Sequence, residues 1–406
     1  MRNKNILFLT PTDDSQYLNF FARELRKHVG DLHVLNVVRY FFSNGPERTE
    51  QHVRDLITDK KIGIIFFSPF ATSHELSVEF YASLKGKVKT VLWMFDDEMY
   101  FDSYSKYYGQ IADLVVTNDY FSAFGYEKIG IPSVYFMACF SRETYFPVET
   151  SKDIDVCFLG NCKKSDRMEY VNFLKENGVS VETFGVGSKN GPVEESKISE
   201  IFSRSKINLD FTKPELSWAN QKELLVNRAR VAKGRWIEIA LTKSFCLTEY
   251  APSTNICFEI GKEIDVFYNK EELLEKARFY LANGGKRAEI AENAYKRALA
   301  DHESETGISK ILKKVEELLE KSGGQKKDSD EIYLSRNFKA SSITMLTFSM
   351  LVLLKNGKLF YALELFSKLF KYGNFIFFRG FFGGLILSGK NIYAKIASQH
   401  GPDPLS

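Results

Sequence analysis

Short apolar runs alternate with stretches of helical spacing along the first part of the chain. The apolar runs are NILFLT, LHVLNVV, IGIIFFSP, TVLWMFDD, ADLVVTND and SVYFMA. Runs that are apolar on both faces and separated by helices are typical of a parallel sheet, because crossover connections lay helices over each face. The pattern therefore predicts a doubly wound α/β domain over residues 1–148.

A second series of the same kind begins after the polar segment FSRETYFPVETSKD. Its apolar runs are IDVCFLGN, SVETFGVG, KINLDFT, SFCLTEY and IDVFYN, and a long charged helical pattern closes it. We expect a second Rossmann-like domain over residues 149–322. Ligands of open α/β sheets bind beyond the carboxyl ends of the strands, so two such domains in tandem are expected to face a cleft.

The last part of the chain, residues 331–406, has a different character. It holds nine Lys or Arg against three Asp or Glu, and its longest stretch without charge, 340–354, is fifteen residues. That length is short of the roughly 18 to 20 residues that cross a bilayer, which argues against a transmembrane helix. Two interpretations remain: a helical tail packed on the main body, or a basic amphipathic surface in peripheral contact with a membrane.

Charge and cysteine content narrow the class of protein. The formal charge is +3, from 55 basic and 52 acidic residues, which predicts no nucleic-acid partner. The five cysteines form no CxxC pair, and the apolar run near the N-terminus is too short for a signal peptide. We therefore expect a cytoplasmic protein, with the inner face of the membrane as the alternative location.

Common cofactor and metal motifs are missing from the sequence. It contains no GxGxxG after the first apolar run, no GxxxxGK[ST], no HExxH and no GxSxG, and its six histidines are dispersed. The sequence thus predicts neither a resident cofactor nor a metal site.

Basic and polar residues follow the apolar runs of the second domain. Gly160 and Asn161 come directly after the opening run, and Arg167 follows within the next turn or helix. A glycine there lets the backbone approach a ligand, and a following helix presents free N–H groups to an anion. The alternative is a turn glycine before a solvated basic helix.

A second basic group precedes the run SFCLTEY. Arg228, Arg230, Lys233 and Arg235 lead to Glu238. The uncharged strand that follows indicates a half-buried helix, and buried cations need an anionic partner. Either a ligand supplies that anion, or Glu238 is an internal salt-bridge partner.

The segment 233–304 resembles the donor-binding half of the CgeB-like (spore maturation protein type) glycosyltransferases, relatives of the group 1 enzymes. The resemblance rests on ordered motifs, namely Arg235 to Glu238, Thr248-Glu249, Gly261 to Phe267, Glu271 to Leu273, Arg287 to Ala291 and His302. DVCFLGN extends it to the start of the second domain. The chain departs from the pattern at Lys243, where relatives commonly have a small residue.

This resemblance implies a GT-B fold in which the second domain holds a nucleotide-diphosphate sugar. Glu238 would accept hydrogen bonds from the ribose hydroxyls, and Lys233, Arg235 and Arg167 would neutralise the diphosphate. Glu249 and Tyr250 would approach the sugar or a phosphate. Gly160 and Asn161 complete the expected donor site.

The first domain is expected to bind the acceptor. If the enzyme inverts the anomeric centre it needs a general base, for which Asp96 is the first candidate and His74 the second. Both residues follow apolar runs. The competing explanation is that Asp97 only caps the next helix.

The sequence therefore predicts a glycosyltransferase that moves a sugar from a nucleotide-diphosphate sugar to a glycan, lipid-linked or protein acceptor. Two alternatives stay open. One is a nucleotide-sugar epimerase of the same fold, which acts on the donor alone. The other is a non-catalytic GT-B scaffold that binds glycan or membrane through the tail.

Overall fold

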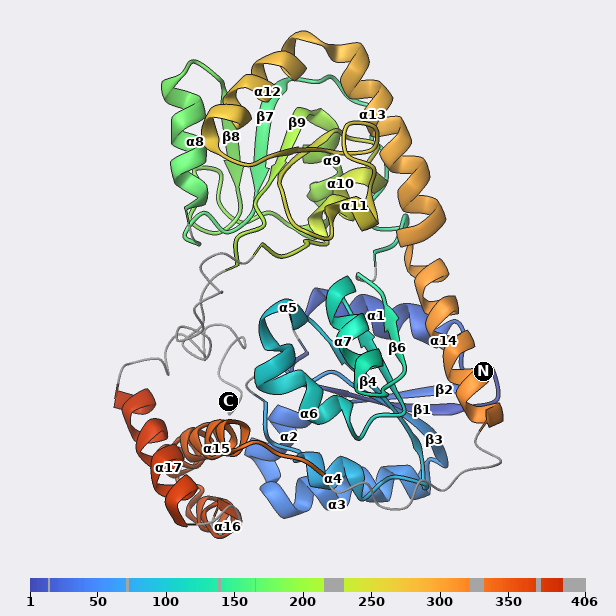
Figure 1. Cartoon of the computed structure of the whole chain (residues 1–406), viewed down its shortest axis with the longest axis vertical. Helices are drawn as coiled ribbons and strands as arrows, with labels where there is room; N and C mark the ends of the chain where they lie inside the picture. Colours follow the sequence, from blue (N-terminus) through green and yellow to red (C-terminus); the bar gives the residue numbers. More distant parts are fainter. Residues whose placement is uncertain are drawn as a thin grey trace. The chain divides into compact units, whose positions relative to one another are not determined.

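The computed structural model describes residues 1–13, 15–70, 73–137, 140–164, 166–214, 230–321, 332–369 and 374–389. It contains two compact units (Figure 1). The first comprises Met1–Asn118, Ser122–Tyr135 and Lys310–Ser406, and the second comprises Asp119–Phe121 and Phe136–Ser309. The main division thus falls at 135/136, not at the expected 148/149, and the C-terminal tail belongs to the first unit.

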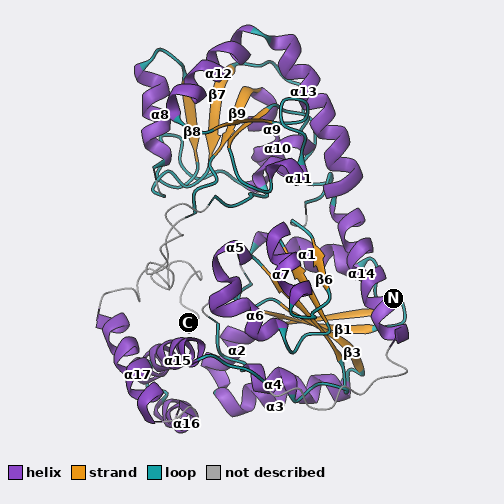
Figure 2. Ribbon diagram, viewed as in Figure 1, coloured by secondary structure: helices purple, strands orange, loops and turns teal. Residues whose placement is uncertain are grey.

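A parallel sheet of six strands, in the order β2-β1-β3-β4-β5-β6, forms the centre of the first unit (Figure 2). Every pairing in it is parallel. The predicted apolar runs supply its strands, which are β1 (Asn5–Thr10), β2 (Asp31–Asn36), β3 (Ile62–Phe67), β4 (Lys89–Met94), β5 (Leu114–Thr117) and β6 (Ser133–Tyr135).

Side chains of β1 alternate between the two faces of this sheet, and each face is covered. Leu7 and Leu9 join one apolar cluster. Phe8 points to the other face, where its ring lies 5.2 Å from Phe21 of α1 (Gln16–Arg26). The connecting helices are α2 (Val37–Asn44), α3 (Pro46–Asp59), α4 (Val78–Ala82), α5 (Asp97–Tyr100), the π-helix η1 (Phe101–Ser105), α6 (Lys106–Gly109) and α7 (Tyr120–Lys128).

The second unit has a parallel sheet of five strands in the order β11-β10-β9-β7-β8. Its strands are β7 (Ile154–Leu159), β8 (Val181–Phe184), β9 (Ser205–Asp210), β10 (Cys246–Glu249) and β11 (Asp265–Phe267). Its helices are α8 (Arg167–Glu176), α9 (Glu195–Arg204), α10 (Arg235–Leu241), α11 (Thr254–Cys257), α12 (Lys270–Ala282), α13 (Gly284–Arg297) and the π-helix η3 (Ala298–His302). The chain reverses its direction across the sheet between β7 and β9, which makes that position the topological switch point.

The C-terminal tail is helical, as predicted. Helix α14 (Ser304–Lys321) begins in the second unit and ends in the first, which also contains α15 (Arg336–Lys355), α16 (Leu359–Leu369) and α17 (Asn374–Gly389). By length and composition α15 could cross a membrane, with a mean hydropathy of 1.3, yet 67% of that window is buried inside the protein. Phe338 of α15 belongs to the core of the first unit, so this helix packs as part of the body.

Candidate functional site

The predicted donor-binding residues meet at the carboxyl edge of the second sheet. Gly160 and Asn161 follow β7, Asp210 ends the neighbouring strand β9, and Glu249 ends β10. Lys233 directly precedes α10, which leads into β10. These positions surround the switch point between β7 and β9, where open α/β sheets bind their ligands.

Asp210 is the centre of charge in this site, and the sequence analysis missed it. Its carboxylate is buried, with 7% of the residue exposed. Burial raises the pKa of Asp210, whereas the positive charges of Arg167, Arg235 and Lys233 lower it. The three cations selected from the sequence therefore all act electrostatically on one buried carboxylate.

The buried side chain of Trp236 holds Asp210 in place. The single Nε1–H of Trp236, in α10, is shared between Asp210 Oδ2 and Thr248 Oγ1, with Nε1 2.9 Å from each oxygen. The indole is 1% exposed. The start of α10, which carries Arg235, is in this way fixed to the ends of β9 and β10.

Arg235 and Glu238 form an ion pair within α10. The Arg235 guanidinium donates from Nη1 to Glu238 Oε2, and the two side chains are 21% and 2% exposed. Burial raises the pKa of Glu238, and the Arg235 charge opposes that rise. The structure thus contains the internal salt bridge that the sequence offered as the alternative, and the ribose contact of Glu238 stays a prediction.

Arg167 lies at the first position of α8, beside the end of β7. Its Nη1 donates to the carbonyl oxygen of Asn161 at 3.2 Å, and its Cζ lies 5.8 Å from the Phe158 ring centroid. The Nε atom is buried and has no hydrogen-bond partner among the described residues. Arg167 therefore keeps donor capacity for a ligand.

The Phe158 ring packs so closely on Gly160 that it favours glycine at this position, with or without a ligand. A Cβ atom there would lie 2.9 Å from Cζ of Phe158. The Asn161 side chain bonds within the same loop: its Oδ1 accepts a hydrogen bond from the Lys163 backbone N–H at 2.9 Å. Packing in the loop after β7 thus explains both residues without a ligand.

The cations of the second basic group differ in what they contact. The half-buried Lys233 ammonium makes no hydrogen bond or ion pair with the residues that the structure describes. Arg230 instead pairs with Glu249, its Nε lying 2.7 Å from Oε1. Arg228 lies outside the described residues. Lys233 is therefore the member of this group whose charge is left for a ligand.

The Glu249 side chain fixes the first residues of the loop that follows β9. Its buried carboxylate accepts hydrogen bonds from the backbone N–H groups of Thr212 and Lys213, from the Thr212 hydroxyl and from Arg230, at 2.7–3.1 Å. Four donors from the protein itself saturate this carboxylate, so Glu249 has a structural role in this structure.

Tyr250 is half-buried at the end of β10. Its ring lies 5.0 Å from the ring of Tyr268, which follows β11.

The two candidates for a general base have different surroundings in the first unit. Asp96 lies two residues after the end of β4, is half-buried, and has a left-handed backbone with φ of 57°. It occupies the cap position of α5 without a side-chain capping bond, while buried Asp97 accepts a hydrogen bond from the Tyr126 hydroxyl. The cap position of α5 is thus that of Asp96, and Asp97, which the competing explanation made the cap, is the first residue of the helix.

His74 is a core residue. It is 5% exposed, its Nδ1 lies 3.1 Å from Ser342 Oγ of α15, and its ring packs on Tyr104 and Phe338. Burial lowers the pKa of His74 to about 3, so the imidazole is neutral. These surroundings favour a packing role for His74, which leaves Asp96 as the candidate base.

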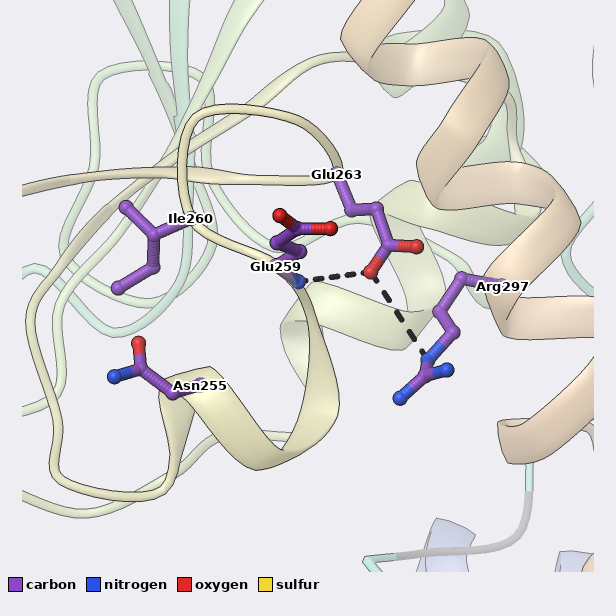
Figure 3. Close-up of a pocket in the computed structure, with 5 residues that line it drawn as sticks. All are labelled: Asn255, Glu259, Ile260, Glu263 and Arg297. Atoms are coloured by element: carbon purple, nitrogen blue, oxygen red, sulfur yellow. Dashed lines mark hydrogen bonds and ion pairs between the residues drawn. The ribbon is translucent and has the colours of Figure 1, made fainter.

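A pocket lies elsewhere in the second unit (Figure 3), and none of the predicted site residues line it. It has a volume of about 410 Å³ and is lined by Asn255, Glu259, Ile260, Glu263 and Arg297. Glu263 accepts a hydrogen bond from the Glu259 N–H at 2.8 Å and lies 4.0 Å from Arg297 Nε. Its acidic groups are already paired with the protein's own donors. No cluster of three metal-ligating side chains occurs within the described ranges.

The fold and the comparison with known proteins indicate the same class of protein. The two parallel sheets with their helices form a GT-B fold, which confirms the fold prediction. Residues 154–313 match a family model described as glycosyl transferase-like. Every predicted donor-binding residue lies in this range, and the match supports the predicted glycosyltransferase activity.

Several solved structures share this fold. HepE from Anabaena, in complex with UDP, has a TM-score of 0.56 at 13% identity and covers 78% of this chain and 100% of its own. Sucrose-phosphate synthase from Thermosynechococcus elongatus has a TM-score of 0.57 at 9% identity, with 79% and 100% covered. A glycosyltransferase from Rickettsia africae has a TM-score of 0.56 at 10% identity, with 81% and 100% covered. No curated protein matches the chain.

Proposed function

We propose that the protein is a CgeB-like glycosyltransferase that moves a sugar from a nucleotide-diphosphate sugar to a glycan, lipid-linked or protein acceptor. One observation carries the proposal. The charges of Arg167, Lys233 and Arg235 all act on the buried carboxylate of Asp210, which ends β9 at the switch point within the range that matches the glycosyl transferase-like family model. Three cations at that position fit a dianionic ligand, and a diphosphate is the anion that such donors supply.

The chemistry follows from the charge that develops during transfer. As the bond between the sugar and the diphosphate breaks, negative charge grows on the leaving diphosphate. Cations that are already in place stabilise that charge without reorganisation, which is the largest contribution a preorganised site makes to the rate. In this proposal Arg167, Lys233 and Arg235 do so, and no resident cofactor takes part.

Binding of the nucleotide would exchange partners within α10. A carboxylate such as Glu238 accepts hydrogen bonds from two vicinal ribose hydroxyls. Those hydroxyls would take the place that Arg235 has on Glu238 in the unliganded protein. The guanidinium is then free to contact the diphosphate, so the ion pair keeps both groups ordered until the donor arrives.

The remaining parts of the proposal concern the acceptor and the location. We place acceptor binding in the first unit, with Asp96 as the base if the reaction inverts the sugar, and the reaction in the cytoplasm. The epimerase alternative needs the same donor site and no acceptor. Release of UDP that depends on an added acceptor would separate the two activities.

Thermal unfolding in the presence of nucleotides tests the donor site, since a ligand that binds the folded state raises its apparent stability. The panel is UDP, GDP, TDP and CMP, with UDP first because HepE was solved with UDP. The Arg235→Ala variant should lose the shift. Arg204→Ala is the matched control, because Arg204 forms an ion pair with Asp153 outside the site. An Arg235→Ala protein that responds like the unaltered chain would refute the diphosphate assignment.

A further inference from the structure

Helices α16 and α17 expose a set of large apolar side chains that the proposed reaction does not use. We call this set the α16–α17 apolar face. Its members are between 37% and 74% exposed, and they are Leu359, Phe360, Leu363, Phe378, Phe382, Leu385 and Ile386. Scattered apolar residues on a surface are ordinary, but a contiguous group of this size marks an interaction site.

The spacing of these side chains makes the face continuous. Residues three and four apart lie on one side of a helix, so Leu359 and Leu363 form one stripe and Phe378, Phe382 and Leu385 form another. Phe366 of α16 joins the two helices, because its ring lies 6.0 Å from Phe377 and 6.3 Å from Phe381. Phe366 is spaced i+7 from Leu359 and i+3 from Leu363, so it belongs to the same side of α16, and on α17 Phe377 and Phe381 directly precede Phe378 and Phe382.

Glycines on the opposite side of α17 fix the direction of its apolar stripe. A Cβ at Gly380 would lie 2.6 Å from Ile343 Cβ of α15, and one at Gly384 would lie 2.6 Å from Thr347 Cβ. Thr344 Oγ1 also donates to the Gly380 carbonyl oxygen at 3.1 Å. The glycine side of α17 is thus held against α15, and the phenylalanine side is turned outward.

The charges on the three helices favour an anionic partner. Together α15, α16 and α17 contain five basic residues and one acidic residue; three of the basic residues are on α15, and Lys368 of α16 pairs with Glu50 of α3 at 3.0 Å, which leaves Arg379 as the basic residue on α17. The single acid, Glu364, accepts a hydrogen bond from the Glu47 backbone N–H of α3 and is therefore directed to the body. Arg379 is exposed directly beside Phe378, and no ion pair joins it to another described residue.

We propose that the α16–α17 apolar face binds the surface of a bilayer that contains anionic phospholipid. Phenylalanine and leucine would enter the interface while Arg379 contacts lipid headgroups, as in helices that lie in the plane of a membrane. Helices of 11 and 16 residues are shorter than the roughly 20 needed to span a bilayer, so both lie on it. This inference goes beyond the proposed function and holds whether or not the protein transfers a sugar.

Vesicle co-sedimentation of the full chain tests the inference. Vesicles of phosphatidylcholine alone are compared with vesicles that also contain phosphatidylglycerol. The full chain should pellet with the anionic vesicles and less with the neutral ones. The variant with Phe360→Ser, Phe382→Ser and Ile386→Ser should lose at least tenfold in binding, and Arg379→Glu about fivefold.

Ile129→Ser with Phe279→Ser is the matched control, because both residues are more than half exposed and lie outside the tail. Its binding should equal that of the unaltered chain.

The UDP-induced thermal shift of every variant reports the donor site separately, so a failure of lipid binding is distinguishable from a failure of the proposed function. Equal pelleting of the triple variant, or no pelleting of the unaltered chain, would overturn the inference. So would a triple variant that changes from dimer to monomer by light scattering without any lipid effect, because the face would then join two copies.

Discussion

Two buried carboxylates at the same sheet edge have different chemistry around them. Glu249 accepts from four donors of its own chain, whereas Asp210 has one indole N–H and three cations near it. A carboxylate that its own chain saturates stabilises a loop. A carboxylate with cations near it, such as Asp210, can hold those cations in position, and the cations can then bind an anion.

The first prediction at the residue scale concerns Glu249→Gln. The amide keeps one acceptor oxygen and turns an NH₂ group toward backbone N–H donors, so buried donors are left unpaired. We expect the free energy of unfolding to fall by about 2–4 kcal/mol, as measured by urea denaturation. Glu292→Gln is the control, because Glu292 pairs with Lys243 at the surface. Similar losses in both variants would contradict a structural role for Glu249.

A second residue-scale prediction concerns pH. The pKa of His74 is lowered to about 3 by burial, against 6.5 for an ordinary histidine. Between these values the unfolded chain binds a proton that the folded chain does not, so stability falls as pH decreases below 6.5. The slope approaches about 1.4 kcal/mol per pH unit.

Comparison with His74→Gln isolates this contribution. Burial raises the pKa of the neighbouring Glu75 to about 7, which has the opposite effect on stability, but that effect is common to both proteins. Urea denaturation at pH 7, 6 and 5 should therefore show a smaller loss of stability in the variant. Parallel pH profiles would show that His74 is not held neutral.

What the sequence revealed about the site depended on how local each contact is. Arg235 and Glu238 are three residues apart, and their pairing could be weighed from spacing alone. The partners of Glu249 lie 19, 36 and 37 residues away, and Ser342 lies 268 residues from His74. No periodic pattern reports contacts of that range, which is why the burial of His74 was not foreseen.

At the scale of elements, the packing of α17 on α15 gives a prediction of its own. Gly380→Ala adds a methyl group where Ile343 and the Ala340 carbonyl are already within 3 Å. The helices must separate, so we expect a destabilisation of about 1–3 kcal/mol in urea denaturation. Gly285→Ala in α13 is the matched control, since nothing lies within 4 Å of the added atom and alanine favours a helix. Equal stability of the two variants would contradict this close packing.

Strands were the elements that the sequence predicted best. Both sheets are parallel and covered on two faces, so their strands are continuous apolar runs that stand out between polar helices. Helix α15 was harder to interpret. A helix buried on most of its surface by its own protein and a membrane helix have similar compositions, and the difference is decided by tertiary contacts such as the packing of Phe338 on Tyr107.

At the scale of the whole molecule, the boundary of the first unit predicts the effect of truncation. A chain that ends at residue 331 lacks α15 and uncovers the apolar cluster that includes Tyr104, Tyr107 and Tyr108. Hydrogen exchange should then show lost protection in β3, β4 and β5, with β7, β9 and β10 unaffected. A chain that ends at residue 356 keeps α15 and should lose less. Unchanged protection in the shorter chain would mean that the tail is dispensable to the first unit.

Domain boundaries were less accessible from the sequence than strands. The linker-like segment near 148 is polar and contains Pro147, yet the second unit already begins at Phe136. Phe140 is fully buried, and its carbonyl accepts a hydrogen bond from the Ser304 N–H at 2.8 Å. This contact across a long stretch of chain decides the boundary, and the local composition does not show it.

The first unit is built from the two ends of the chain, with the second unit encoded between them. During translation the α15 segment that covers His74 therefore leaves the ribosome only after the complete second unit has been made. Until then apolar surface of the nascent N-terminal sheet stays uncovered, for the time that some 200 residues take to synthesise, roughly 10–40 s. Chaperones that hold emerging chains would meet this protein at that stage, and the second unit, which is nearly continuous in sequence, would finish folding first.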